Sequence, residues 1–564
     1  MKKRVITITL ILAGILFSVN IIKAQEQFLW AYSAGAALGW EEAGGMARDN
    51  SGNIYIIGTF QDKITFGSVN VVSSGGSDII VAKFSPAGTL TWARKVGIGT
   101  TFGGNETGKA IAVNSSGNSI TILGTYSNNS DSLSFLTNGS IKIPPSSGGQ
   151  DLFVAQLDAN GAVQWAEKIG GSGHEDAGAV AYFSNGDFIV AGTYNVDINI
   201  GSNNYVSQGN DDIFIVKYNS NRTQAWSLTT GNGINNISVS DLKVRSNGDF
   251  YFGGELRGSA DFDSNTITSN GESDAYLAKY DSTGAYIFAV NMGGSLNDGL
   301  TKIFIDNFNQ TYVSGFYSGS NVSIGSTNLT AATNTDIFFV KMNSNDSILF
   351  AKTANGNGNN MPNGLYVAGT GANKKIYLSG TFENVLNFGI STATNNPEQR
   401  ASLGQKDVFL AYYDSLGNVI SSARAGGLNN ETNVGIVADN SNNMFIYGSY
   451  RAQAGFSPFS LTVSGGSDLY IARYGLNTTG ISEAANNKTM QVYPNPSNGM
   501  VTINFSDAAD YIVKIYDVRG VCVINESIST LKSQLDLSHL SNGVYFLNAS
   551  GADKNFQQKL IIQK

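Results

Sequence analysis

One short pattern recurs along most of the chain and constrains its fold more than any other feature. An Asp opens an apolar run, a turn follows, and fourteen residues after the Asp stands a Trp or Phe. The pattern occurs at Asp78/Trp92, Asp151/Trp165, Asp212/Trp226, Asp274/Phe288 and Asp336/Phe350, and less complete copies begin at Asp407 and Asp468. Successive Asp positions are 73, 61, 62, 62, 71 and 61 residues apart. A period of about 65 residues is within reach of blade-type repeats.

The copy that begins at Asp468 lacks its aromatic strand. Residues 28–32 (Phe-Leu-Trp-Ala-Tyr) form an aromatic strand-like run of the same kind that belongs to no other copy. Each unit contains four strand-like runs, and four antiparallel strands repeated radially form a β-propeller blade. We therefore predict an all-β chain with a seven-bladed β-propeller at residues 25–474, closed by pairing of the N-terminal strand with the Asp468 strand. A linear β-solenoid is the alternative, but its period would be shorter and it would need no borrowed strand.

The repeat also resembles a known family. The motifs of the first unit are Gly52-Asn53, the run ending in Gly58-Thr59-Phe60, the strand Asp78 to Lys83, and Trp92-Ala93. Together they are similar to the bacterial SBBP-type β-propeller repeat, and the similarity covers residues 28–474. The resemblance implies a fold but no ligand, because folds of this kind host many functions.

A polar linker at residues 475–489 precedes a different module at residues 490–564, where alternating apolar and polar residues predict a small Ig-like β-sandwich. Its motifs are Tyr493-Pro494-Asn495-Pro496 with Gly499, then Asn542-Gly543 with Tyr545, and Lys559 near the end. In this order they resemble the type A C-terminal sorting domain of the type IX secretion system of Bacteroidota. The resemblance implies that the type IX machinery is a partner and that the chain crosses the outer membrane. An ordinary Ig-like binding domain is the alternative.

Residues 1–24 read as a cleavable signal peptide, with a basic start, an apolar core at residues 5–19 and cleavage after Ala24. No other apolar run approaches membrane length, so we expect no transmembrane segment and a secreted or outer-membrane surface-attached protein. The net charge of −8 argues against nucleic acid as a partner. The single cysteine, Cys522, can form no intramolecular disulfide, and we expect it to be a small buried strand residue.

Residues that carry chemistry are few. The two histidines, His174 and His539, cannot build a multi-His metal site, and no Gly-x-Ser-x-Gly elbow surrounds a Ser. His174 lies in a loop whose pattern repeats, which favours a structural role. The turns at residues 49–53 and 439–443 have oxygen-bearing side chains at loop spacing, but Asx-turn chemistry explains them without calcium. We predict no catalytic residue, no metal site and no cofactor, with calcium as the open alternative.

Loops offer the best candidate binding surface. In a propeller, the loops from the last strand of one blade to the first strand of the next open on one face, together with the polar loops that we expect between the second and third strands. We call this the loop face. The opposite face, the turn face, carries tight turns such as residues 158–161, which leave little room for specific contacts. Sites are commonly grafted onto loops of a rigid scaffold. We expect exposed binding residues on the loop face at Glu41, Glu42, Glu106, His174, Glu175, Asp176, Asn297, Asp298 and Glu431.

Four Asp-Ser pairs resemble the O-glycosylation acceptor motif of secreted Bacteroidota proteins, which makes Ser132, Ser282, Ser347 and Ser415 candidate acceptors. Asp-Ser is also ordinary turn chemistry.

The predicted function is a secreted or surface-displayed, non-enzymatic propeller that binds an extracellular glycan or protein. One alternative is a secreted carbohydrate-active enzyme, a hydrolase or lyase, that uses carboxylates from several blades at the channel mouth. A purely structural display module is a third.

Overall fold

The computed structural model of the protein describes residues 26–96, 105–127, 132–135, 141–231, 233, 236–392, 394–439, 441, 443–476, 490–505, 510–551 and 555–564. These fall in two compact units, one spanning Glu26–Leu476 and the other lying in the chain from Asn477 onward. The predicted signal peptide and nearly all of the predicted linker lie outside the described residues. Apart from one 3-10 turn, η1 (Gly371–Asn373), every regular element in the described residues is a β-strand, so the all-β prediction is confirmed. None of the described residues forms a helix long and apolar enough to cross a membrane.

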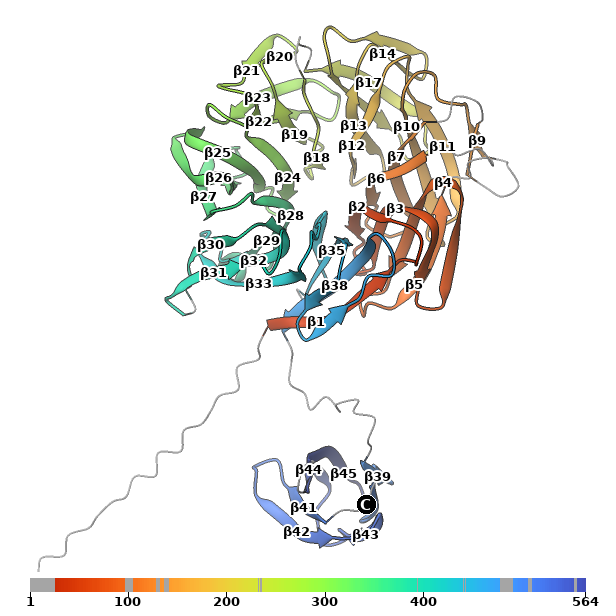
Figure 1. Cartoon of the computed structure of the whole chain (residues 1–564), viewed down its shortest axis with the longest axis vertical. Helices are drawn as coiled ribbons and strands as arrows, with labels where there is room; N and C mark the ends of the chain where they lie inside the picture. The colour runs from red at the N-terminus through yellow and green to blue at the C-terminus, as the bar shows by residue number, and fades with distance from the viewer. Residues whose placement is uncertain are drawn as a thin grey trace, which may run out of the picture. The chain divides into compact units, whose positions relative to one another are not determined.

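The first unit consists of antiparallel sheets arranged around a common axis, with the first strand of each nearest the axis (Figure 1). We number the sheets in chain order and give their strands in hydrogen-bonded order. The first sheet is β2 (Glu41–Arg48), β3 (Ile54–Phe66), β4 (Val69–Phe84) and β5 (Leu90–Val96), and the second is β6 (Asn105–Val113), β7 (Ser119–Ser127), β10 (Asp151–Asp158) and β11 (Val163–Ile169). The third is β12 (Glu175–Tyr182), β13 (Phe188–Tyr194), β16 (Asp212–Tyr218) and β17 (Gln224–Thr230), and the fourth is β18 (Asp241–Val244), β19 (Phe250–Leu256), β22 (Asp274–Tyr280) and β23 (Tyr286–Met292).

The remaining sheets follow the same plan, except that the fourth strands of the fifth and sixth sheets also pair with a two-stranded hairpin of the next sheet, which gives these two sheets six strands in all. The fifth is β24 (Gly299–Ile305), β25 (Thr311–Ile324), β26 (Thr327–Met342) and β27 (Ile348–Gly356), and the sixth is β28 (Met361–Ala368), β29 (Lys375–Phe382), β32 (Asp407–Tyr413) and β33 (Val419–Gly427). The seventh is β34 (Gly435–Ala438), β35 (Met444–Tyr450), β38 (Asp468–Leu476) and, from the other end of the unit, β1 (Glu26–Ala34). β1 pairs with β38 from Glu26↔Leu476 to Ala34↔Leu469, so β38 continues two residues beyond the predicted start of the linker.

The polar segments between the second and third strands, which we predicted to be loops, form hairpins instead. They are extensions of β3 with β4 and of β25 with β26, together with the pairs β8 (Leu133–Ser134) and β9 (Lys142–Ile143), β14 (Asp197–Ile200) and β15 (Asn203–Val206), β20 (Ser259–Phe262) and β21 (Asn265–Thr268), β30 (Val385–Ile390) and β31 (Pro397–Ala401), and β36 (Ala454–Phe456) and β37 (Phe459–Leu461). Each hairpin buries two apolar residues at alternate positions, such as Ile198 and Ile200. This alternation anchors the hairpin to its sheet.

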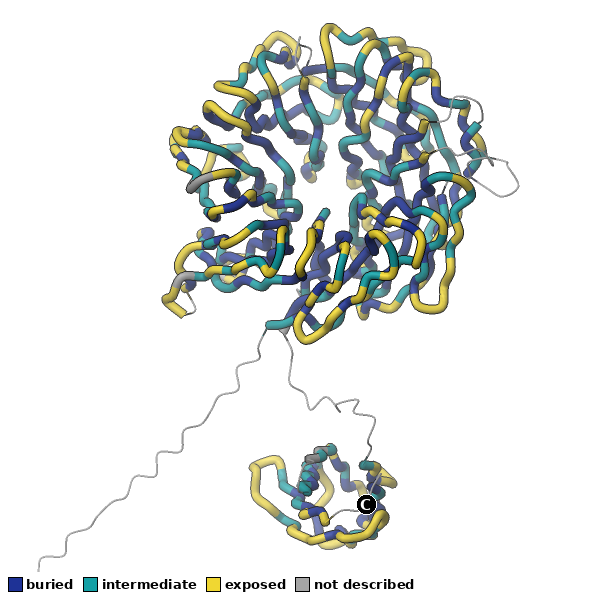
Figure 2. Tube along the Cα trace, in the orientation of Figure 1, coloured by how far each residue is buried: buried dark blue, intermediate teal, exposed yellow. Residues whose placement is uncertain are grey.

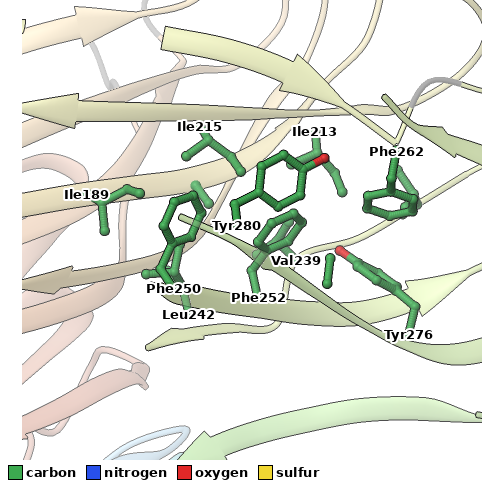
Figure 3. Close-up of a cluster of buried hydrophobic side chains, with 14 of the residues drawn as sticks. Ile189, Ile213, Ile215, Val239, Leu242, Phe250, Phe252, Phe262, Tyr276 and Tyr280 are labelled. Carbon is green, nitrogen blue, oxygen red and sulfur yellow. The ribbon is translucent and has the colours of Figure 1, made fainter. Parts of the chain in front are cut away.

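Buried side chains concentrate along the strands, while exposed residues mark the turns and the hairpin tips (Figure 2). The large apolar clusters of this unit each lie between two consecutive sheets. Figure 3 shows the cluster between the third and fourth sheets, where Ile189 and Ile213 meet Phe250 and Phe252. A cluster of the same kind joins the seventh sheet to the first, with Phe445 and Leu469 among its members.

The recurring aromatic residue of the fourth strand packs onto a glycine turn of the next sheet. A Cβ atom added at Gly161 would lie 2.9 Å from the ring of Trp92, and one added at Gly417 would lie 2.9 Å from the ring of Phe350. Both glycines also have positive φ, which L side chains rarely adopt. Trp30 of β1 packs in the same way onto Gly88 of the first sheet, where an added Cβ atom would lie 2.1 Å from its ring.

The C-terminal unit has two sheets that share one apolar core. One sheet is β39 (Met490–Tyr493), β40 (Met500–Phe505) and β43 (Lys532–Asp536), and the other is β42 (Cys522–Ile528), β41 (Tyr511–Tyr516), β44 (Gly543–Ser550) and β45 (Asn555–Ile562). The rings of Phe505 and Tyr511 stack between them at 4.1 Å. Our expectation that Cys522 is buried is wrong: it is exposed, because it begins an edge strand directly after a turn.

Candidate functional site

Each repeated Asp lies on the third strand of its sheet and is buried; it is the first residue of that strand except at Asp78 and Asp336, where the hairpin extension precedes it. One carboxylate oxygen accepts a hydrogen bond from the backbone N–H four residues earlier. This distance is 2.9 Å in the same arrangement at Asp151, Asp212, Asp274, Asp407 and Asp468. The other oxygen faces the glycine that follows the fourth strand; a Cβ atom added at Gly170 would lie 2.4 Å from Asp151 Oδ1. The repeated Asp and the Gly after the fourth strand therefore form one recurring structural contact.

We call the contact between the repeated Asp of one sheet and the next sheet a joint. At all but one of the joints, a second polar residue contacts the Asp. This residue comes from the first strand of the next sheet or from the loop before it. The pairs are Asp78 with Glu106, Asp151 with Glu175, Asp274 with Asp298, Asp407 with Glu431, Asp468 with Glu41, and Asp336 with Asn360. The backbone holds the partner in place. Glu175 N–H donates to the carbonyl of Gln150, and Glu431 N–H donates to that of Lys406, both at 2.9 Å.

Burial and the neighbouring Asp together keep the second carboxyl of a pair protonated. Burial raises the pKa of Glu106 to about 8, and the charge of Asp78 raises it further. Burial and Asp151 raise the pKa of Glu175 to about 9, and burial and Asp407 raise that of Glu431 to about 8. Burial and Asp468 raise the pKa of Glu41 to about 9. Burial raises the pKa of Asp298 to about 6, and Asp274 adds to the shift. At neutral pH the four glutamates are therefore protonated and do not repel the Asp, and Glu106, Glu175 and Glu431 donate a hydrogen bond to it across the joint.

This arrangement overturns part of the predicted binding surface. Glu41, Glu106, Glu175, Asp298 and Glu431 were expected to be exposed, but none is more than 1% exposed. Glu106, Glu175 and Glu431 are buried in a hydrogen bond with the Asp of the neighbouring sheet, whereas Asp298 accepts hydrogen bonds from the backbone N–H groups of Gly294 and Ser318 at 2.6 and 2.8 Å. The other four candidates, Glu42, His174, Asp176 and Asn297, are exposed on the loop face as expected.

The loop face carries a polar pocket of about 660 Å³ near the joint between the third and fourth sheets. It gathers four of the predicted residues, His174, Glu175, Asp176 and Asn297, and leaves out Glu41, Glu42, Glu106, Asp298 and Glu431. It is also lined by Asn236, from the loop before the fourth sheet. Its other lining residues, which the sequence interpretation missed, are Gln150, Thr193, Asp211, Ile237, Ser238, Glu255, Arg257 and Ser273.

Two of the missed residues stand where the repeat changes. The second strand usually ends in Gly-Thr-aromatic, as at Thr125 and Thr193, but the fourth sheet has Glu255 at the Thr position. Ile237 bridges to Leu256 as Glu431 bridges to Tyr450, so it occupies the place of the second carboxyl. A search for departures from the repeat would have found both residues.

The charges of the pocket are mixed. Asp176 forms an ion pair with Lys109 at 3.2 Å and is more than half exposed. Glu255 is half-buried, and burial raises the pKa of its carboxyl while the nearby Arg257 opposes the shift. His174 is positioned by its backbone, whose N–H donates to Asn195 Oδ1 at 2.8 Å. The pocket thus offers acidic, basic and amide groups side by side, a set suited to hydroxyl-rich or peptide ligands.

The oxygen-rich turns use their carboxylates internally. Asp439 Oδ1 accepts hydrogen bonds from the backbone N–H groups of Ser441 and Asn443 at 2.7 and 2.9 Å, and Arg473 donates to Oδ2 at 2.6 Å. Asp49 accepts from Asn53 N–H at 2.9 Å and from the Tyr55 hydroxyl at 3.0 Å. Asx-turn bonding therefore accounts for both. Among the described residues, no group of three or more His, Cys, Asp or Glu side chains is placed to hold a metal ion.

The candidate glycosylation sites differ in exposure. Ser347 is exposed in the turn between β26 and β27, whereas Ser132, Ser282 and Ser415 are half-buried. The carbonyl groups of Ser282 and Ser415 accept hydrogen bonds from Lys217 and Lys341 at 3.3 and 3.2 Å. Ser347 is the most accessible of the four hydroxyls.

In the C-terminal unit, part of the sorting motif holds the last strand. Asn495 Nδ2 donates to the Lys559 carbonyl at 2.6 Å, and Ile561 N–H donates to Asn495 Oδ1 at 2.9 Å. Asn542 Oδ1 accepts from Lys564 N–H at 2.9 Å. Tyr493 and Lys559 are exposed and so are available to a partner. The remaining members, Pro494, Pro496, Gly499, Gly543 and Tyr545, lie in the adjoining turns and in β44.

Residues 491–563 match a family model described as a secretion system C-terminal sorting domain. The match covers the C-terminal unit and implies interaction with the type IX secretion machinery and secretion or attachment to the cell surface. The sequence shows no match to a curated protein.

Solved structures with some likeness to the chain include enzymes and a protein of unknown function. A Dyadobacter fermentans protein of unknown function is 10% identical, with 80% of this chain and 99% of that chain covered and a TM-score of 0.38. Trypanosoma rangeli sialidase in complex with sialic acid is 6% identical, with 93% and 83% covered and a TM-score of 0.31. A glycoside hydrolase family 32 protein of Bifidobacterium adolescentis is 10% identical, with 80% of each chain covered and a TM-score of 0.27.

Proposed function

We propose that the chain is a non-enzymatic binding protein, exported by the type IX secretion system through its C-terminal unit, whose first unit binds an extracellular glycan or protein. In this proposal a signal peptide at residues 1–24 starts export, and the first unit is a closed seven-bladed propeller of SBBP-type repeats. The loop-face pocket is the binding site.

Three contacts support closure of the ring. β1 completes the seventh sheet by pairing with β38. Trp30 repeats on Gly88 the packing that Trp92 makes on Gly161. Gly35, which follows β1, bridges to Thr65 of the first sheet as Gly170 bridges to Asn199 of the third. A rigid ring of this kind would hold the loop-face groups in fixed positions.

The observation that carries the binding proposal is the convergence of His174, Asp176 and Arg257 around one 660 Å³ pocket. A glycan array and a panel of extracellular proteins, probed with the purified chain, would find the ligand. We expect His174→Ala and Arg257→Ala each to weaken binding about tenfold, since a hydrogen bond to a charged group contributes roughly 1.5–3 kcal/mol. Asn160→Ala, in an exposed turn of the opposite face, is the matched control. An equal loss in the control would place the site elsewhere.

One observation favours the enzymatic alternative. Burial raises the pKa of Glu255, and this carboxyl shares the pocket with Asp176 and Asp211. A carboxylic acid beside carboxylates is the arrangement that glycoside hydrolysis uses. If the chain releases products from any polysaccharide and Glu255→Gln abolishes release, the protein is an enzyme. Binding without product release supports the non-enzymatic proposal.

Export is tested separately. Removing residues 490–564 should leave a propeller that folds but accumulates in the periplasm. The appearance of that truncated protein outside the cell would contradict sorting by the C-terminal unit.

A further inference from the structure

The first strands of the sheets enclose a second cavity of about 900 Å³, which shares no lining residue with the loop-face pocket. It extends to the turns between first and second strands, such as residues 114–116 and 184–186. It is therefore on the turn-face side of the axis, where the sequence interpretation expected little room for specific contacts.

Charge in this cavity is opposite in sign to that of the whole chain. The chain has a formal net charge of −8. The lining includes five cationic side chains, Arg48, Lys109, Lys243, Arg245 and Lys302, but Asp241 is the single acidic residue that lines it. Small residues such as Gly178 and Ala179 line the third sheet, and of the cations on the fourth and fifth sheets Lys243 and Lys302 are partly exposed while Arg245 is buried.

Most of these cations already have protein partners. Arg245 pairs with Asp346 at 2.6 Å, Lys109 pairs with Asp176 at 3.2 Å, and Lys243 pairs with Asp241 at 2.5 Å. The other oxygen of Asp241 accepts a hydrogen bond from the Ile303 backbone N–H at 2.9 Å. Asp241 therefore has little capacity left for another cation.

Lys302, on β24, is half-buried, and no residue in the described part of the chain forms a hydrogen bond or an ion pair with its ammonium group. Burial lowers the pKa of Lys302; Asp241 opposes the shift, and Lys243 adds to it. An anion in the cavity would compensate this partly desolvated ammonium group.

Aromatic rings stand beside the cations. Phe304 is two residues after Lys302 on β24, so both side chains lie on the same face of the strand. The rings of Phe304 and Tyr366 meet edge to face at 5.0 Å, and both line the cavity. A cation next to a half-exposed aromatic pair suits a ligand that has an apolar ring face and a negative group.

We propose that this cavity binds an acidic sugar unit, with Lys302 and Lys243 contacting its carboxylate or sulfate group and Phe304 and Tyr366 contacting its ring. The site is independent of the loop-face pocket, and neither site requires the other.

The test is calorimetric titration of the full chain with glucuronate, glucose 6-sulfate, glucose and inorganic sulfate. We expect at least one of the two acidic sugars to bind about tenfold or more tightly than glucose, and their order identifies carboxylate or sulfate as the preferred group. Lys302→Met should remove this preference, and Lys302→Gln should do the same if the Met variant does not fold. Lys142→Met, at an exposed position outside the cavity, should bind as the wild type does.

A second variant separates the ring from the charge. Phe304→Leu should weaken binding of the acidic sugar severalfold and leave inorganic sulfate unaffected. Binding of inorganic sulfate as tight as that of either sugar would overturn the saccharide assignment. Acidic sugars that fail to bind at millimolar concentration, or bind Lys302→Met as well as wild type, would overturn the site itself.

Discussion

The two joints on either side of the third sheet differ in the residue that contacts the repeated Asp. At the joint before the third sheet, Asp151 meets Glu175 and also Lys168, whose ammonium lies 2.5 Å from its carboxylate. At the joint after it, Asp212 keeps its backbone hydrogen bond, but Ile237 occupies the place of the second carboxyl. Both joints are buried, and each contributes a residue to the loop-face pocket, Glu175 from the first and Ile237 from the second. The repeated carboxyl contact therefore has a structural role, and the departure from it at Ile237 places an apolar side chain in the wall of the pocket.

A third kind of joint lies between these extremes. Asn360 Nδ2 donates to Asp336 Oδ1 at 3.2 Å, so an amide replaces the protonated carboxyl. An amide donates at any pH, whereas a carboxylic acid donates only while protonated. The molecule thus contains carboxyl, amide and apolar versions of one contact, and mutations can convert one version into another.

The largest effect on stability should follow from removing β1, the strand that completes the seventh sheet. Deleting residues 28–33 takes away β1, including Phe28, whose ring lies 5.3 Å from those of Phe456 and Tyr474, and Ser33, which donates to Asp468 at 3.2 Å. Burial of large aromatic side chains stabilises by roughly 1.5–3 kcal/mol each, and the deletion also exposes a strand edge. We expect aggregation or a fall in Tm of more than about 10 °C. A thermal melt like that of the wild type would mean that the seventh sheet does not need β1.

The next effect should come from converting the carboxyl joint into the apolar one. Glu175→Leu removes the hydrogen bond from Glu175 to Asp151, whose Oδ2 keeps the Ser147 backbone N–H and the Lys168 ammonium, and we expect the free energy of unfolding to fall by about 2 kcal/mol. Glu175→Gln, which imitates the amide joint, should cost less than about 1 kcal/mol. Denaturant titration of both variants measures the difference. Equal losses would show that the joint needs a side chain of the right size and not a hydrogen-bond donor.

The carboxyl joints, unlike the amide joint and the apolar joint, should make the stability of the fold depend on pH. Glu41, Glu106, Glu175 and Glu431 have pKa values raised from 4.5 to about 8 or 9, so the folded protein binds more protons than the unfolded chain across that interval. Their stabilisation is complete below pH 4.5 and is lost as pH rises through 8 to 9. We expect Tm to be about 5 °C or more lower at pH 9 than at pH 6.

The matching control replaces these four glutamates with Gln. Its Tm should change less between pH 6 and pH 9 than that of the wild type. A wild-type Tm that rises with pH would contradict proton sharing at the joints.

The smallest effect on the free energy of unfolding should come from replacing the apolar contact at Asp212 with a carboxyl contact. Ile237→Glu places a carboxyl beside Asp212, as at five other joints, and we expect the free energy of unfolding to change by about 1 kcal/mol or less. The same variant should weaken ligand binding at the loop-face pocket, which Ile237 lines. Unchanged binding would show that the pocket does not depend on this exception.

The strands were predictable because their apolar runs repeat and because their turns carry Gly at positive φ, as at Gly161. The hairpins between second and third strands were missed, although Ile198 and Ile200 show the two-residue period of a half-buried strand, because short polar segments also suit loops. The burial of Glu106 and Glu175 could not be read from sequence, since it depends on Asp78 and Asp151 of the neighbouring sheets, whose contact with them is set by the packing of the sheets. Arg257 was missed because the residue directly after the second strand varies among the repeats, and only Arg451 repeats the Arg.

Proton sharing at the joints also changes what the sequence says about charge. The formal net charge of −8 counts every carboxyl group as ionised. With Glu41, Glu106, Glu175 and Glu431 protonated, the folded chain carries about four fewer negative charges at pH 7. Unfolding at that pH releases those protons to the solvent, so the heat measured by calorimetry will depend on the ionisation enthalpy of the buffer. The folded first unit therefore holds about four protons at these joints at pH 7 and releases them when its sheets separate.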